Sequence, residues 1–194
     1  MHDERITGMD AIPASVFRGC LFCKSGRESD VVRRYEKLFP GGRAVAPMRT
    51  RYRRRDGAEL EEQVPLLPGY VFFEATISAD TAEAFDSALR AFSRTDSVLK
   101  LLRYSDGMWR LQGSDDQFAR MLLETDGSIG ASRAFFDEGN RIRILSGFLK
   151  DYEGSIVRVN KRRRTVEASI DFHDKKVSMW LGYELVTKVG SEDG

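Results

Sequence analysis

Positively charged side chains gathered in two short stretches are the residues of this chain best suited to bind a ligand. The segment 49–55 contains five arginines, and Lys161–Arg164 is a run of four cations. The formal net charge of the 194 residues is only +1, so overall composition does not indicate a polyanionic partner. Because local patches decide where phosphate groups bind, both stretches are candidate nucleic-acid contacts.

The second stretch is expected to project from a turn, because the preceding Asn160 is a residue that favours turns. Cations on neighbouring strands and turns extend the charge into a basic rim. Such a rim suits phosphate contacts, and RNA helices are recognised largely through backbone and shape. A solvated turn without a ligand is the alternative. The predicted RNA-binding residues are Arg141, Arg143, Lys150, Lys161, Arg162, Arg163, Arg164, Lys175 and Lys176.

The first stretch is expected to form a hairpin, because Asp56-Gly57 is a typical hairpin turn. The returning arm, Glu59–Val64, brings acidic side chains opposite the arginines. Part of the positive charge is then neutralised across the two strands. The alternative is a solvated, salt-bridged hairpin that has no partner.

The two cysteines, Cys20 and Cys23, have the spacing of a redox pair or of half a zinc site. The chain has no second cysteine pair, and His2 and His173 are its only histidines. The cysteines also lie in an apolar strand pattern, where residues three apart face opposite sides. We therefore expect two buried, reduced thiols and no metal site. His173 is expected to be a surface histidine in a turn.

Catalytic motifs are missing from the sequence: it has no phosphate loop of the G-x-x-x-x-G-K type and no G-x-S-x-G. Asp115-Asp116 could mimic a metal-binding pair, but these carboxylates open a predicted helix, whose positive end favours them. No apolar run approaches the roughly 20 residues of a membrane helix, and Met1–Ala14 lacks the apolar core of a secretion signal. We expect a cytoplasmic protein that is not an enzyme and uses no cofactor.

The first part of the chain alternates strands with helices. Val16–Cys23 is an apolar strand, and Ser25 and Glu28 have the spacing of a capping box before an amphipathic helix. Pro65–Glu74 predicts a turn leading into a buried strand, and a second helix and a further strand follow. This order is the split βαβ pattern, an antiparallel sheet with two helices on one face.

The opposite face of that sheet is expected to be available to a partner. Tyr70 and Phe72 share it, with Leu67 at its edge, and an apolar or helical partner could bind there. From the sequence alone, the favoured interpretation is instead a core completed over this face by Phe22, Met48 or Leu101.

The second part of the chain has a strict two-residue periodicity with turn residues between short segments, which predicts a small all-β barrel. The segment 125–134 is small, polar and glycine-containing, and is expected to be a flexible linker. The predicted fold class is α+β. It comprises a flexible arm (1–15), an N-terminal domain (16–124), the linker and a barrel (135–190).

Three motifs, in this order, resemble the NusG family of transcription elongation factors. Pro68-Gly-Tyr-Val-Phe72 is similar to the family's P-G-Y-V/I-F/L strand, and Ser25-Gly-Arg-Glu28 to the segment after its first strand. Gly139–Gly147 together with Glu153-Gly154-Ser-Ile-Val157 is similar to the KOW motif. The resemblance covers roughly Val16 to Val189.

This resemblance implies an NGN-like domain that docks on the clamp helices of RNA polymerase and an SH3-like KOW barrel that binds RNA or a protein. Such a protein is a monomeric clamp and adaptor that suppresses pausing. The implied polymerase-binding positions are Leu67, Tyr70 and Phe72. The implied contacts to upstream or non-template DNA are Arg49, Arg51 and Arg53.

Departures from the housekeeping pattern point to a specialised paralogue. Arg18-Gly19 stands where the family has a Trp-Tyr pair, Phe148 replaces a common proline, and Lys161–Arg164 is unusually basic. The chain is most similar to LoaP-type paralogues, whose barrel recognises an RNA hairpin, and the implied function is processive antitermination. The alternatives are a housekeeping adaptor whose barrel binds a protein partner and a non-transcriptional RNA-binding KOW protein.

Overall fold

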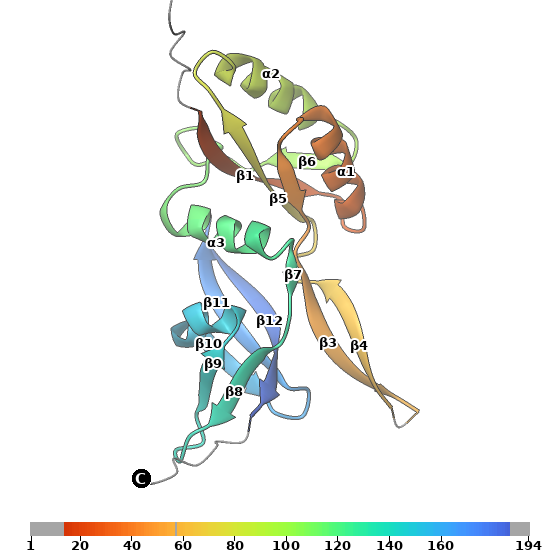
Figure 1. The fold of residues 1–194 in the computed structure, drawn as a ribbon, viewed down its shortest axis with the longest axis vertical. Helices are drawn as coiled ribbons and strands as arrows, with labels where there is room; N and C mark the ends of the chain where they lie inside the picture. Colours follow the sequence, from red (N-terminus) through yellow and green to blue (C-terminus); the bar gives the residue numbers. More distant parts are fainter. Residues whose placement is uncertain (1–13, 57, 187–194) are drawn as a thin grey trace, which may run out of the picture.

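The first domain is built on a four-stranded antiparallel sheet in the order β2-β5-β1-β6. The computed structural model describes residues 14–56 and 58–186, so the expected arm lies almost wholly outside the described residues. The strands are β1 (Ser15–Cys23), β2 (Arg43–Val45), β5 (Tyr70–Ile77) and β6 (Val98–Leu101). Helices α1 (Glu28–Leu38) and α2 (Ala82–Phe92) cover one face, which confirms the split βαβ prediction (Figure 1).

Alternation along the central strands divides the apolar residues between two cores. Val71 and Phe73 pack under α1 and α2, whereas Phe72 belongs to a core on the opposite side. The cysteines follow the same rule, with Cys23 on the helix side and Cys20 on the other, both buried as free thiols. Burial raises the pKa of Cys23 to about 11, with a further contribution from the charge of Glu28.

The sheet face expected to be available is covered in the structure. Helix α3 (Gly113–Glu124) lies across it, between the sheet and the barrel (Figure 1). The Phe72 ring is 5.6 Å from that of Phe118 on this helix. Of the two possibilities raised by the sequence, the structure has the completed core and not the open face. Helix α3 and the barrel supply most of this core, and Met48 and Leu101 are not part of it.

The turn that leads into β5 is fixed by Glu28 and Gly69. Gly69 has φ +85°, and a Cβ there would lie 2.9 Å from the Cys23 carbonyl oxygen, so only glycine fits without strain. Its N–H donates to Glu28 Oε1 at 2.8 Å. Glu28 therefore does not act as a capping-box partner of Ser25, and α1 begins after Arg27 with no side-chain cap. The carboxylate serves a buried tertiary contact instead.

A second sheet carries the arginine-rich segment. Strands β3 (Met48–Arg55) and β4 (Ala58–Pro65) form the expected hairpin, with Arg55 opposite Ala58; Gly57 lies outside the described residues. The short strand β7 (Ser128–Ile129) pairs in parallel with the start of β3. Part of the segment expected to be a flexible linker is thus hydrogen-bonded to the hairpin, since the Met48 N–H donates to the Gly127 carbonyl at 2.7 Å.

The barrel domain, as we call residues 132–185, contains a five-stranded sheet in the order β10-β11-β12-β8-β9. Its elements are β8 (Ser132–Phe136), β9 (Ile142–Ser146), the 3₁₀ segment η1 (Phe148–Ser155), β10 (Ile156–Asn160), β11 (Thr165–Phe172) and β12 (Lys175–Leu185). Inward residues alternate along β11, with Val166, Ala168 and Ile170 buried. An α+β first domain followed by a β-rich second domain confirms the predicted fold class. No helix of the described residues is long and apolar enough to span a membrane.

Glu28→Ala should lower the free energy of unfolding by about 1–3 kcal/mol, because the buried Gly69 N–H would lose a charged acceptor. Urea denaturation followed by circular dichroism measures this change. Glu83→Ala, which removes an exposed carboxylate from the first turn of α2, is the matched control and should cost under about 1 kcal/mol. Equal losses in the two variants would contradict the role assigned to Glu28.

Candidate nucleic-acid interface

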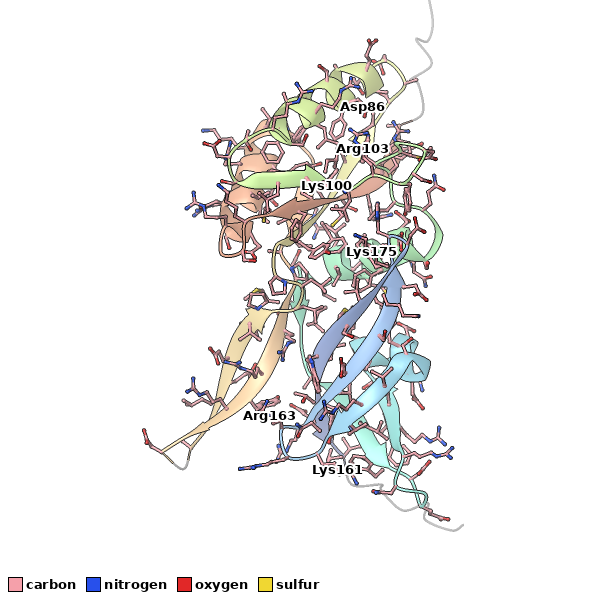
Figure 2. All side chains as sticks on the ribbon, turned by 180° about the vertical axis from the view of Figure 1, so that it is seen from behind. Asp86, Lys100, Arg103, Lys161, Arg163 and Lys175 are labelled. Atoms are coloured by element: carbon pink, nitrogen blue, oxygen red, sulfur yellow. The ribbon has the colours of Figure 1, made fainter. Side chains whose placement is uncertain are left out.

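A cleft of about 890 Å³ separates the β3–β4 hairpin from the turn that joins β10 to β11. Its two sides are lined by the predicted DNA-facing arginines and by the basic turn of the barrel. These two groups lie far apart in the sequence. Figure 2 shows Lys161 and Arg163 in this turn, beside the hairpin. The lining residues are Arg49, Arg51, Tyr52, Arg53, Asn160, Lys161, Arg162, Arg163, Arg164, Thr165 and Trp180.

The hairpin side of the cleft is only partly neutralised. Arg51 Nη2 donates to Glu62 Oε2 at 2.6 Å, as expected for a cross-strand pair, and this bond lowers the pKa of Glu62. Arg49 and Arg53 lie opposite Val64 and Leu60, which carry no charge. The hairpin therefore presents more positive charge to the cleft than its acidic arm offsets.

Arg49 is a partly buried cation. Its Nη1 is buried and, within the described part of the chain, has no hydrogen-bond partner; the same holds for Arg51 Nε. Burial lowers the pKa of the Arg49 guanidinium, and the charge of Arg51 lowers it further. An arginine nevertheless stays protonated, so the guanidinium has a positive charge that the surrounding residues do not fully compensate.

The barrel side of the cleft is a tight turn, as expected from the turn preference of Asn160. Asn160 Oδ1 accepts the Arg163 N–H at 3.0 Å and so closes the turn. Lys161 Nζ donates to Asn140 Oδ1 at 2.5 Å and lies 4.2 Å from the centre of the Phe136 ring. Arg162 and Arg163 are exposed, and the described residues provide them with no acidic partner. Their charges are available to a ligand.

The other five predicted RNA-binding residues do not line the cleft. Arg143 Nε donates to Asp137 Oδ2 at 2.8 Å, so its charge is neutralised within the barrel. Lys150 Nζ donates to the Ile144 carbonyl at 2.9 Å. Arg141 is exposed and follows Asn140, the acceptor of the Lys161 ammonium, so it lies near the basic turn although it does not line the cleft. Lys175 and Lys176 are separated from the Lys161–Arg164 turn by all 8 residues of β11, or roughly 25 Å at the usual rise per residue.

Trp180 on β12 is a lining residue that sequence reasoning missed. It is half-buried, and Arg158 lies 6.0 Å from its ring centre. Its position among the outward-facing residues of an alternating strand could have identified it from the sequence, because a large aromatic side chain there points away from the core. The cleft thus combines cations with an indole on which a base can stack.

The three predicted polymerase-binding residues are brought together, but they are covered by the barrel. Leu67 and Phe72 are 5% and 0% exposed, and Tyr70 is half-buried. Phe172, at the end of β11, inserts here with its ring 5.4 Å from that of Phe72 and 6.5 Å from that of Tyr70. Of the covering residues considered from sequence, Phe22 does contact Tyr70, at 5.1 Å between rings, but Phe172 supplies the main cover.

A cavity of about 270 Å³ remains beside Tyr70 at this seam between the domains. Its lining includes Lys100 from β6 and Lys175 from β12, both labelled in Figure 2. One of the predicted RNA-binding lysines is therefore placed against the first domain and away from the basic cleft.

Polar contacts hold the same interface. Asp115 Oδ2 accepts the Tyr104 hydroxyl at 2.6 Å and the His173 N–H at 3.1 Å. The rings of Tyr104 and His173 stack at 4.6 Å. Burial, followed by the bond to Asp115, raises the pKa of Tyr104. His173 is thus half-buried between the domains, and the prediction of a surface histidine was wrong because its strand ends against α3.

Asp116, the neighbour of Asp115, pairs with Arg18 at 3.1 Å within the first domain. The acidic pair therefore divides between two structural roles at the start of α3. Within residues 14–56 and 58–186, no three cysteine, histidine or acidic side chains come together as a metal site.

Comparisons with known proteins agree on one family. A family profile described as "Transcription termination factor nusG" matches residues 20–122, more than half of the chain. The Thermus thermophilus transcription termination/antitermination protein NusG is 25% identical over 140 residues, 69% of this chain and 73% of that protein. The Synechocystis protein of the same name is 22% identical over 138 residues, 70% of this chain and 67% of its own length.

A solved structure described as "Domain interaction in Thermotoga maritima NusG" shares the fold. It superimposes with a TM-score of 0.53 and 21% sequence identity, covering 87% of this chain and 94% of that one.

Arg49→Met should leave the free energy of unfolding unchanged or raise it by up to about 1 kcal/mol, because it removes a partly buried nitrogen that lacks a partner. Urea denaturation at low salt measures the effect. Arg51→Met is the matched control and should not stabilise the protein, because it also breaks the bond to Glu62. A loss of more than about 1 kcal/mol in Arg49→Met would contradict the assignment of uncompensated charge.

Proposed function

Because the chain belongs to the NusG family of transcription termination factors, we propose that it is a specialised elongation factor that binds RNA polymerase and promotes processive antitermination. The first domain would dock on the clamp helices of the polymerase, and the barrel domain would bind an RNA hairpin. The protein would act in the cytoplasm as a monomer, without turnover and without a cofactor.

The proposal that the first domain binds polymerase rests on the position of Phe172. The face formed by Leu67, Tyr70 and Phe72 accepts a large apolar side chain in this structure. An apolar helix surface from the polymerase is a ligand of the same chemistry. Both cannot occupy the face together, so the barrel must leave before the polymerase binds. The apparent affinity for polymerase would then scale with the fraction of molecules in which the barrel is undocked.

The RNA part is supported by the exposed cations of the β10–β11 turn. Arg162 and Arg163 project from the barrel without acidic partners among the described residues, so they can contact phosphate groups. The proposed DNA contacts are Arg49, Arg51 and Arg53 on the hairpin. This hairpin belongs to the first domain, so it would stay with the polymerase when the barrel swings away.

Asp115→Ala should strengthen binding to purified bacterial RNA polymerase by about 5-fold or more, because the His173 N–H loses its acceptor and the docked arrangement loses stability. Fluorescence anisotropy with labelled protein gives the dissociation constants. Tyr70→Ala should act in the opposite direction by removing part of the docking face. Readthrough of an intrinsic terminator in single-round transcription should follow the same order.

Asp116→Ala is the control, because its carboxylate pairs with Arg18 inside the first domain. It should leave the affinity for polymerase nearly unchanged. The proposal fails if wild-type protein and Asp115→Ala bind polymerase equally, or if Tyr70→Ala binds as tightly as wild type.

A further inference from the structure

Positive charge is concentrated in the cleft between β3 and the β10–β11 turn. Arg49 and Arg53 face it from the first domain, and Arg162 and Arg163 face it from the barrel. None of these four has an ion pair within the described residues. Like charges brought together from two domains repel, so the docked arrangement has an electrostatic cost that a polyanion would remove.

We propose that this cleft is a single nucleic-acid site shared by both domains, and that it holds the phosphate backbone of one single-stranded segment. The inference rests on the proposed function, because it extends the RNA contact of the barrel onto the hairpin of the first domain. It adds that the complete site exists only while the two domains are docked and the polymerase-binding face is covered. After undocking, the barrel turn contacts RNA and the hairpin contacts DNA, as proposed above.

The unpartnered nitrogens indicate that the ligand is an anion. Arg49 Nη1 and Arg51 Nε are buried donors without acceptors in the described structure, although nearly all buried donors in proteins are paired. Both belong to residues that line the cleft. A phosphate oxygen entering the cleft would supply the missing acceptors and form charge-assisted hydrogen bonds.

The aromatic residues favour a single strand. Trp180 lines the cleft together with both sets of cations, so a base of the same strand can stack on it. Paired bases inside a duplex do not expose their faces in this way, whereas hairpin loops and unpaired ends do. A hairpin loop is therefore a suitable ligand.

The hairpin and the barrel are held in register by direct contacts, so the cleft is a built feature. The Tyr52 hydroxyl donates to Glu184 Oε1 at 2.8 Å. Gly182 lets β12 approach β3 closely, because a Cβ at this position would lie 3.3 Å from the Thr50 carbonyl oxygen. A strand bound across the cleft would reinforce these contacts and favour the docked arrangement.

The test compares paired variants of the full chain. Binding of a labelled RNA hairpin with an unpaired loop, and of single-stranded DNA with the loop sequence, is measured by fluorescence anisotropy at several salt concentrations. Arg162→Gln/Arg163→Gln removes charge from the barrel side, and Arg49→Gln/Arg53→Gln removes it from the hairpin side. Lys37→Gln/Arg94→Gln, on the far side of the first sheet, removes the same charge and is the control.

Both cleft variants should weaken binding by about 10-fold or more at low salt, and each should reduce the slope of log affinity against log salt by about 2. The control should bind as wild type does, with one strand per protein. Tighter binding of RNA than of DNA would identify RNA as the source of the strand, and equal binding would show that the backbone alone is recognised. Both results support the shared site.

The failures of the two proposals can be told apart. If only Arg162→Gln/Arg163→Gln weakens binding, the barrel binds RNA as proposed but the shared cleft is overturned. If neither cleft variant differs from the control, or if wild-type protein does not bind, both proposals are overturned. Binding of two strands per protein would also overturn a single shared site. Thermal unfolding of each variant is measured alongside, so that a loss of binding is not mistaken for a loss of the fold.

Discussion

Insertion of Phe172 into the first domain is the contact on which the rest of the arrangement depends. Its ring meets Phe72 from the sheet and Phe118 from α3, at 5.4 Å and 5.6 Å. Aromatic pairs of this kind add about 0.5–1.5 kcal/mol each beyond the area that they bury. Because one side chain joins three elements, the same contact covers the apolar face and sets the position of the barrel beside the β3–β4 hairpin.

The short connection between the domains restricts the positions that the barrel can take. A freely flexible linker would let the barrel take many positions, but β7 is paired with β3, and β8 begins only three residues later, at Ser132. β8 then pairs in parallel with the end of β12. Little chain remains between these paired strands. Undocking would therefore swing the barrel about residues 130–131 without requiring any change inside either sheet.

The two candidate surfaces respond to docking in opposite ways. The apolar face is closed by the barrel, whereas the basic cleft is completed by it. A ligand of the first surface and a ligand of the second would therefore oppose each other through one equilibrium. This coupling follows from placement alone, because docking of the barrel covers one surface and completes the other.

Local patterns in the sequence determined much of this molecule. Alternation placed Cys20 and Cys23 in separate cores, Asp56-Gly57 specified the hairpin, and Asn160 specified the turn that carries the four cations. These outcomes depend on residues a few positions apart, whose geometry is set by backbone sterics and by the two-residue period of strands. The motifs that resemble the NusG family lie within the same local segments.

Tertiary structure decided which surfaces meet. Glu28 has the spacing of a cap, yet it bonds Gly69 because burial makes that donor the more costly one to leave unpaired. Lys175 and Arg163 are both basic turn residues, but an intervening strand sends them to opposite ends of the barrel (Figure 2). Arg49 and Arg162 are more than a hundred positions apart and line one cleft. No local rule predicts such meetings, because they arise from how two domains pack.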